Sequence, residues 1–130
     1  LGVYDAQLFT VLARATEKLI HDFNSQELAN TAWAFATLGV SDAQLFTVLA
    51  REVENCIHDF NSQGLANTAW AFATLGVSDA QLFTVLARAA EKRIHDFNLQ
   101  ELANTAWAFA TLGVYDAQLF TVLARAAENR

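Results

Sequence analysis

Apolar side chains recur along this chain with the period of an α-helix, in segments that polar residues separate at regular intervals. Within residues 5–20, Leu8, Leu12 and Leu19 fall on one side, because successive residues of a helix are rotated by about 100°. Within residues 25–38, Leu28 and Phe35 share a side in the same way. The pattern predicts a first set of helices over residues 5–20, 42–57, 79–94 and from 116 onward, and a second set over residues 25–38, 62–75 and 99–112.

The helical pair returns every 37 residues. Residues 38–74 and 75–111 differ at six positions only. A fixed period in this range is typical of a solenoid, in which each repeat buries its apolar face against the next. We therefore predict an all-α protein, an α-solenoid of about three and a half helix-turn-helix repeats with seven helices. Residues 1–130 would form one repeat array with units 1–37, 38–74, 75–111 and a half unit 112–130, and we expect it to be a fragment of a longer protein.

Polar residues and glycines mark the predicted helix ends. The predicted N-caps of the first helices are Ser41 and Ser78, each in a capping box, with Asp5 and Asp116 as caps where a tyrosine replaces the serine. The second helices begin at an asparagine, Asn24 in the first unit, which is predicted to form a capping box with Glu27. A left-handed glycine is predicted to end each second helix, at Gly39, Gly76 and Gly113.

Composition and charge narrow the classes of function. Eight basic and 14 acidic residues give a net charge of −6, which argues against a general polyanion-binding surface but leaves room for a local basic stripe. Polar residues interrupt every apolar run, so we expect no membrane-spanning segment and no membrane partner. Cys56 is the single cysteine, which excludes a disulfide within the chain.

Residues 23–39, Phe-Asn-Ser-Gln-Glu-Leu-Ala-Asn-Thr-Ala-Trp-Ala-Phe-Ala-Thr-Leu-Gly, carry a family resemblance. The Phe-x-x-Gln entry, the Leu-Ala pair, the Trp-Ala-Phe-Ala run and the closing Leu-Gly recur in residues 60–76 and 97–113. This block resembles the second half of octotricopeptide and heptatricopeptide repeats, which also occur in FAST-kinase-like organellar proteins. The resemblance implies an RNA-binding α-solenoid of mitochondria or plastids that acts in RNA stability, processing, editing or translation.

The second helices present amide and hydroxyl side chains on the face opposite the apolar one. Helical-repeat RNA readers use two or three such side chains per repeat to recognise one base. The predicted RNA-binding residues are therefore Gln26, Asn30 and Thr37, with Gln63, Asn67, Thr74, Gln100, Asn104 and Thr111 in the other units. The alternative is a structural one, in which the asparagines form a hydrogen-bonded ladder that holds the repeats in register.

The first helices carry an arginine at the same position of every unit. Stacked about 10 Å apart, these side chains could follow a phosphate backbone. The predicted phosphate contacts are Arg14, Arg51, Arg88 and Arg125. The alternative is an ion pair with the glutamate three residues further on, which is the more common outcome on a solvated helix.

Other recurring side chains are assigned to structure. Trp33, Trp70 and Trp107 lie at the edge of the apolar arc, and we expect them to pack between helices. The histidines of successive repeats lie too far apart to share a metal ion, and we expect them to meet the carbonyls that end the first helices: His21, His58 and His95. No residues stand out from the repeat as a catalytic constellation, so we predict neither an enzyme nor a cofactor.

Taken together, these features predict a non-enzymatic module that binds single-stranded RNA. Because the candidate reader residues are identical in all three complete repeats, we expect a preference for a homopolymeric or low-complexity tract. The alternative partner is a protein, bound by the same solenoid acting as a scaffold, which the acidic balance favours. The end helices lack a covering repeat, so we also expect self-association or fraying at the ends.

Overall fold

The computed structural model describes residues 6–130, and within that range all regular secondary structure is helical, with no β-strand. The first helices of the units are α1 (Ala6–Leu19), α3 (Ala43–Asn55), α5 (Ala80–Lys92) and α7 (Ala117–Glu128). The second helices are α2 (Ser25–Leu38), α4 (Ser62–Thr74) and α6 (Leu99–Thr111). The predicted fold class is confirmed, and the seven described helices begin and end within two residues of the predicted bounds. Short 3₁₀ turns follow three of the first helices, at Ile20–Asp22, Ile57–Asp59 and Ile94–Asp96.

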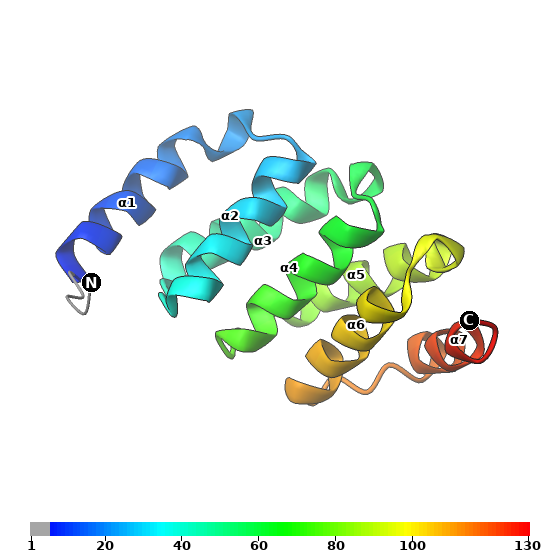
Figure 1. Ribbon diagram of the computed structural model, residues 1–130. Coiled ribbons are helices and arrows are strands. Elements are labelled where there is room, and N and C mark those ends of the chain that lie inside the picture. Colours follow the sequence, from blue (N-terminus) through cyan, green and yellow to red (C-terminus); the bar gives the residue numbers. More distant parts are fainter. Residues whose placement is uncertain (1–5) are drawn as a thin grey trace.

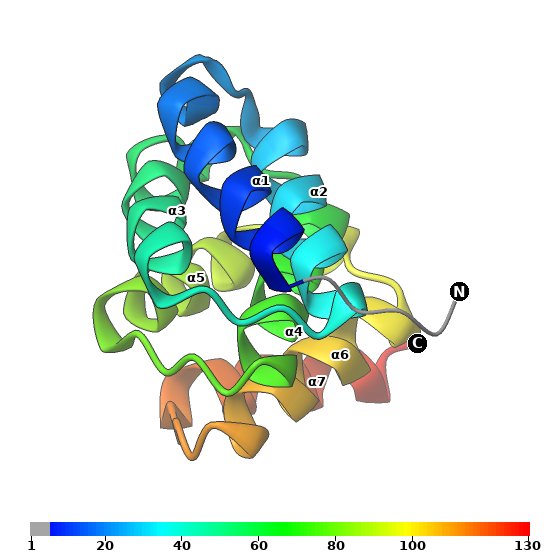
Figure 2. The same cartoon turned by 90° about the vertical axis from the view of Figure 1, so that its left-hand side faces the viewer.

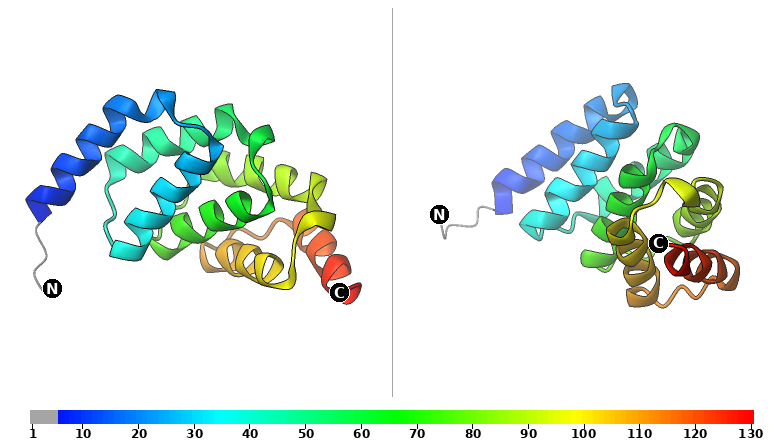
Figure 3. Two further views of the ribbon diagram at one scale, coloured as in Figure 1. Left: turned by 45° about the horizontal axis from the view of Figure 1, so that its top comes forward. Right: turned by 45° about the vertical axis from the view of Figure 1, so that its right-hand side comes forward.

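The helices form two layers. Figure 1 shows α2, α4 and α6 side by side, with α1 and α7 at opposite ends of the stack. Figure 2 shows α3 and α5 on one side of the molecule and α2, α4 and α6 on the other. In the left view of Figure 3, α1, α3, α5 and α7 follow the outside of an arc whose inside holds α2, α4 and α6. We therefore call α1, α3, α5 and α7 the outer helices, and α2, α4 and α6 the inner helices.

Side-chain size explains the curvature. The inner helices contact one another far more closely than the outer helices do. Their sequences are rich in alanine, and a small side chain lets two helix axes approach. The larger side chains fill the space between the layers, where Phe46 of α3 packs edge-to-face on Phe72 of α4 with ring centroids 4.9 Å apart. The same contact joins Phe83 and Phe109 one repeat later.

The helix caps are partly as predicted. Asn24 forms the predicted capping box with Glu27, and Asn98 forms the same box with Glu101. The predicted serine caps Ser41 and Ser78 are wrong, whereas the predicted cap Asp116 is confirmed. The cap is an aspartate in every described case, and the carboxylates of Asp42, Asp79 and Asp116 accept hydrogen bonds of 2.9 Å from the backbone N–H three residues on. Asp5, the remaining predicted cap, lies outside the described residues.

Left-handed glycines end the inner helices, as predicted. Gly39, Gly76 and Gly113 have φ angles of 73°, 71° and 72°, a conformation in which a Cβ atom would be strained. The chain then turns back sharply toward the outer layer. Among residues 6–130, no helix has the length and apolarity needed to cross a membrane.

The first repeat leaves apolar surface uncovered. Leu12 of α1 is 44% exposed, whereas its counterparts Leu49 and Leu86 are 0% and 2% exposed. The difference arises because an inner helix of the preceding repeat covers the counterparts, and no described residue precedes α1. The helix itself is formed over Ala6–Leu19, and self-association through this surface stays a prediction.

Candidate functional site

The exposed side of the inner helices carries an ordered stripe of polar and aromatic side chains. At about 100° per residue, spacings of four, seven and eleven place Gln26, Asn30, Trp33 and Thr37 within an arc of about 60°, so they share one side of α2. The stripe repeats on α4 and α6. We call the full set the inner-helix stripe: Gln26, Asn30, Trp33, Thr37, Gln63, Asn67, Trp70, Thr74, Gln100, Asn104, Trp107 and Thr111.

The tryptophans do not all pack as predicted. Trp33 and Trp107 are both 47% exposed, and only Trp70 is partly buried against the core. The reason is geometric, because seven residues make nearly two turns and place Trp33 beside Gln26 rather than in the narrow contact between inner helices. Sequence reasoning assigned these residues to packing, but the same helical spacing could have identified them as part of the stripe.

The amide groups of the stripe are available to a ligand. Within the described residues, the side chains of Gln26, Asn30, Gln63, Asn67, Gln100 and Asn104 make no hydrogen bond to another protein group. The alternative prediction of a hydrogen-bonded asparagine ladder is therefore not realised in this structure. An amide can donate and accept at the same time, as a base edge requires.

A polar groove of about 360 Å³ lies between α2 and α4. Its walls include Gln26 and Asn30 from α2 and Gln63 and Asn67 from α4. Pockets that hold small molecules or parts of larger ligands start at about 300 Å³, so the groove is large enough to hold one planar ring system. The structure thus brings the predicted glutamines and asparagines of two successive repeats to one place.

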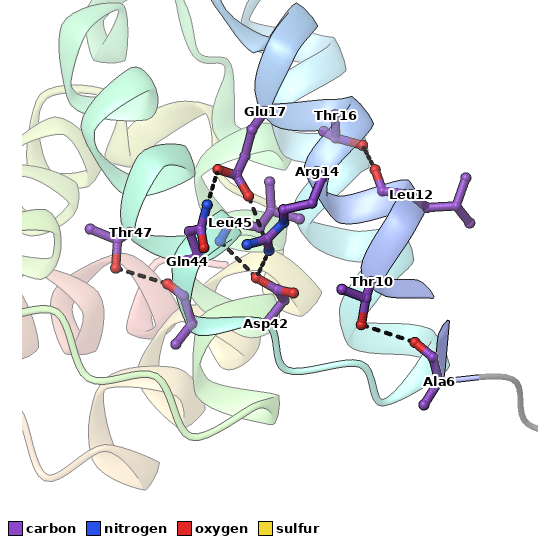
Figure 4. A network of polar contacts seen from close by, with 11 residues as sticks. Ala6, Thr10, Leu12, Arg14, Thr16, Glu17, Asp42, Gln44, Leu45 and Thr47 are labelled. Carbon is purple, nitrogen blue, oxygen red and sulfur yellow. Dashed lines mark hydrogen bonds and ion pairs between the residues drawn. The ribbon is translucent and has the colours of Figure 1, made fainter. Parts of the chain in front are cut away.

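The predicted phosphate-contacting arginines lie in the outer layer, and three of them form ion pairs within the protein. Arg14 contacts Glu17 of its own helix at 3.0 Å and also pairs with Asp42, the cap of the next outer helix (Figure 4). Gln44 completes the link by donating to Glu17 at 2.9 Å. Arg51 and Arg88 repeat the arrangement with the carboxylates of the following units. We call each set of arginine, glutamate and next-repeat aspartate an arginine clamp.

Arg125 differs from the other three arginines. It is exposed, and no ion pair involves it among residues 6–130. The ion pair with the glutamate three residues on, which was the alternative prediction, forms at Arg14, Arg51 and Arg88. The pairing with an aspartate 28 residues away was not predicted, because nothing in one repeat indicates how the next one is oriented.

The two sets of predicted binding residues belong to different layers. All eight lysines and arginines lie on outer helices or within two residues of their C-terminal ends, and the inner helices carry none. A strand that follows the inner-helix stripe therefore meets amides, hydroxyls and indoles rather than cations. The prediction that the arginines contact phosphates stays a prediction, and at three positions two carboxylates compete for the guanidinium.

Further links join the repeats near the ends of the outer helices. Arg93 donates a 2.8 Å hydrogen bond to the carbonyl oxygen of His58, and Arg130 donates one of 2.7 Å to that of Phe97. The histidine prediction is wrong, because the imidazoles meet carboxylates rather than carbonyls. His21 contacts Glu52 of the next repeat at 2.8 Å, since a flexible glutamate there can reach the exposed ring.

Residues 6–130 contain no cluster of metal-binding side chains, and their one cysteine is not an activated thiol. No cluster of three or more His, Cys, Asp or Glu side chains suited to a metal ion occurs in the described part of the chain. Burial raises the pKa of the Cys56 thiol, and the charges of Asp59 and Glu52 raise it further. A thiol with a raised pKa is a weak nucleophile at neutral pH.

The lowered pKa of the capping residue Asp116 makes the stability of the fold depend on pH. Burial opposes ionisation of Asp116, but hydrogen bonds from the Leu119 N–H and from Arg88 lower its pKa overall. A carboxylate with a lowered folded-state pKa stabilises the fold above its unfolded pKa, about 3.9, and the stabilisation is lost as the pH falls through the folded value. We expect the free energy of unfolding to decrease between about pH 5 and pH 2, and to decrease less in Asp116→Asn, which keeps a capping oxygen. Urea unfolding at several pH values measures this, and equal slopes for both proteins would contradict it.

A comparison with protein-family models places nearly the whole chain in one family. The family model for the RNA-editing substrate-binding complex 6 protein matches residues 1–129. No curated protein matches the chain.

Proposed function

Since the chain belongs to the RNA-editing substrate-binding complex 6 family, we propose that it is a non-enzymatic module that binds single-stranded RNA along the inner-helix stripe. Unpaired bases are bound by stacking on aromatic rings and by hydrogen bonds to their edges. The stripe offers both, with exposed indoles between amide and hydroxyl groups. The observation that carries the proposal is this combination on one side of three successive helices, with the amides unpaired within the described residues.

The biological setting is part of the proposal. The octotricopeptide-like block in residues 23–39 and its two copies support a role in RNA processing, stability or translation in a mitochondrion or plastid. The name of the matched family refers to a complex that binds the substrates of RNA editing, which agrees with a role on transcripts. In such a complex the module would hold RNA and leave the chemistry to other subunits.

A protein partner is the second candidate, and one observation favours it. The inner helices carry no lysine or arginine, so the stripe lacks the cations that nucleic-acid surfaces usually supply. At the far end of the array, α6 and α7 also form an apolar groove lined by Leu102, Phe120 and Leu123. A helix of another subunit could pack there in the manner of a further repeat.

The deciding experiment measures binding to the four homopolymeric RNAs at two salt concentrations. We expect one homopolymer to bind best, because the same residues recur in every repeat. Contact through the stripe predicts a slope of log affinity against log salt of about −1 or weaker, whereas four arginine–phosphate contacts would give about −3, at about −0.7 per contact. Equal and negligible binding of all four RNAs would overturn the proposal in favour of a protein partner.

A further inference from the structure

The groove between α2 and α4 lies where the repeat is interrupted. The third residue of the inner helix is Glu27 in the first unit and Glu101 in the third, but Gly64 in the second. A Cβ atom on Gly64 would lie 3.1 Å from Cδ2 of Phe60 and 3.2 Å from Oδ1 of Asn61. Phe60, Asn61 and Gly64 all line the groove, so the glycine leaves open a space that a side chain would narrow.

The glycine also frees a hydrogen-bond donor. In the first and third units, the backbone N–H of the capping asparagine donates to the glutamate, at 2.9 Å from Asn24 and 3.0 Å from Asn98. Asn61 has no such acceptor, and its N–H makes no hydrogen bond to any other described residue. Compared with the same position in the first and third units, the groove therefore lacks the glutamate carboxylate and has an unpaired backbone N–H.

We propose that this groove is a single-base subsite, which takes one unpaired nucleobase of a bound RNA between α2 and α4. The inference rests on the proposed function and deepens it. The base lies between the amides of Gln26 and Asn30 on one side and those of Gln63 and Asn67 on the other. A carbonyl oxygen of the base, or an oxygen of its own phosphate, accepts the hydrogen bond that Asn61 N–H offers. The junction between α4 and α6 has Glu101 at the corresponding position, so the two junctions bind a base with different affinities.

The repeat itself supplies reciprocal variants for the test. Gly64→Glu gives the second unit the residue of its neighbours, and Glu101→Gly gives the third unit the residue of the second. Gly64→Glu adds the missing half of a capping box and removes a helical glycine, so it is expected to fold at least as well as the original chain. A loss of RNA binding in this variant can then be distinguished from a loss of folded structure. Thermal unfolding by circular dichroism checks both variants.

The measurement is an NMR titration of the ¹⁵N-labelled chain with the four homopolymeric RNA hexamers. In the unmodified chain, the backbone amides of Asn61 and Gly64 are expected to shift on binding. In Gly64→Glu, the Asn61 shift is lost and affinity falls about tenfold, corresponding to the loss of one or two hydrogen bonds and of the space for the base. In Glu101→Gly, the amide of Asn98 shifts in addition.

The outcomes separate this subsite from the proposed function. RNA binding that shifts the stripe residues but leaves Asn61 and Gly64 unmoved would overturn the subsite and leave RNA binding standing. Unchanged affinity in Gly64→Glu would do the same. Failure of every hexamer to bind would overturn both proposals.

Discussion

Replacing Arg51 with alanine is expected to lower the free energy of unfolding by about 2 kcal/mol. The guanidinium of Arg51 lies between Glu54 of its own helix and Asp79, the cap of the next outer helix. These carboxylates are only 11% and 22% exposed, so removing the cation leaves two poorly hydrated negative charges facing each other. The effect is smaller than for a fully buried pair, because the arginine side chain is itself 39% exposed.

Arg125 provides the matched control. It has the same position in its helix, but no ion pair holds it among the described residues. Arg125→Ala is expected to change stability by no more than about 0.5 kcal/mol. Equilibrium urea unfolding of both variants measures the difference. Equal losses in the two proteins would mean that the arginine clamp contributes nothing across the repeat junction.

The joint replacement of Trp33 and Trp107 by alanine is expected to weaken RNA binding by about 2 kcal/mol or more, roughly thirtyfold. Stacking of a base on an aromatic side chain contributes about 1–3 kcal/mol, and these two indoles are the most exposed rings of the inner-helix stripe. Because the stripe lacks cations, stacking makes up a larger share of the affinity than in a basic groove. Fluorescence anisotropy with the best-binding homopolymer measures the loss.

Phenylalanine variants at the same positions serve as the control for stacking. Trp33→Phe with Trp107→Phe keeps an aromatic face and is expected to retain most of the affinity. Circular dichroism shows whether the alanine variant keeps its helices. An alanine variant that is folded and binds RNA as tightly as the original would place the RNA somewhere other than the stripe.

The fold could be predicted from the sequence because its determinants are local. Helical periodicity, the asparagine caps such as Asn24 and the glycine stops such as Gly39 each act within a few residues. The 37-residue period then indicates how the units stack. The misplaced cap is also instructive: Ser41 and Asp42 both match a cap residue, and Asp42, which caps the helix, is also the one that pairs with Arg14 of the preceding repeat.

The candidate site was harder to predict because its determinants are contacts between repeats. Nothing within one unit indicates that Arg51 pairs with Asp79, or that His21 contacts Glu52. Gly64 was visible in the sequence as one of six differences between two units, but its effect appears only where Phe60 and Asn61 border the groove. The candidate residues could therefore be identified from the sequence, whereas the helix layer in which each one lies and the residues that it contacts could be seen only in the structure.

The arginine clamp has a consequence for how such an array can change its length. Excision of residues 38–74 would join Thr37 to Leu75, the same pair of residue types that joins Thr37 to Leu38. Arg14 would then be 28 positions from Asp79, the separation it now has from Asp42. Unequal recombination between repeats could thus remove or add a whole unit and leave an arginine clamp at every remaining junction, although His21 would then meet Ala89 at the position of Glu52.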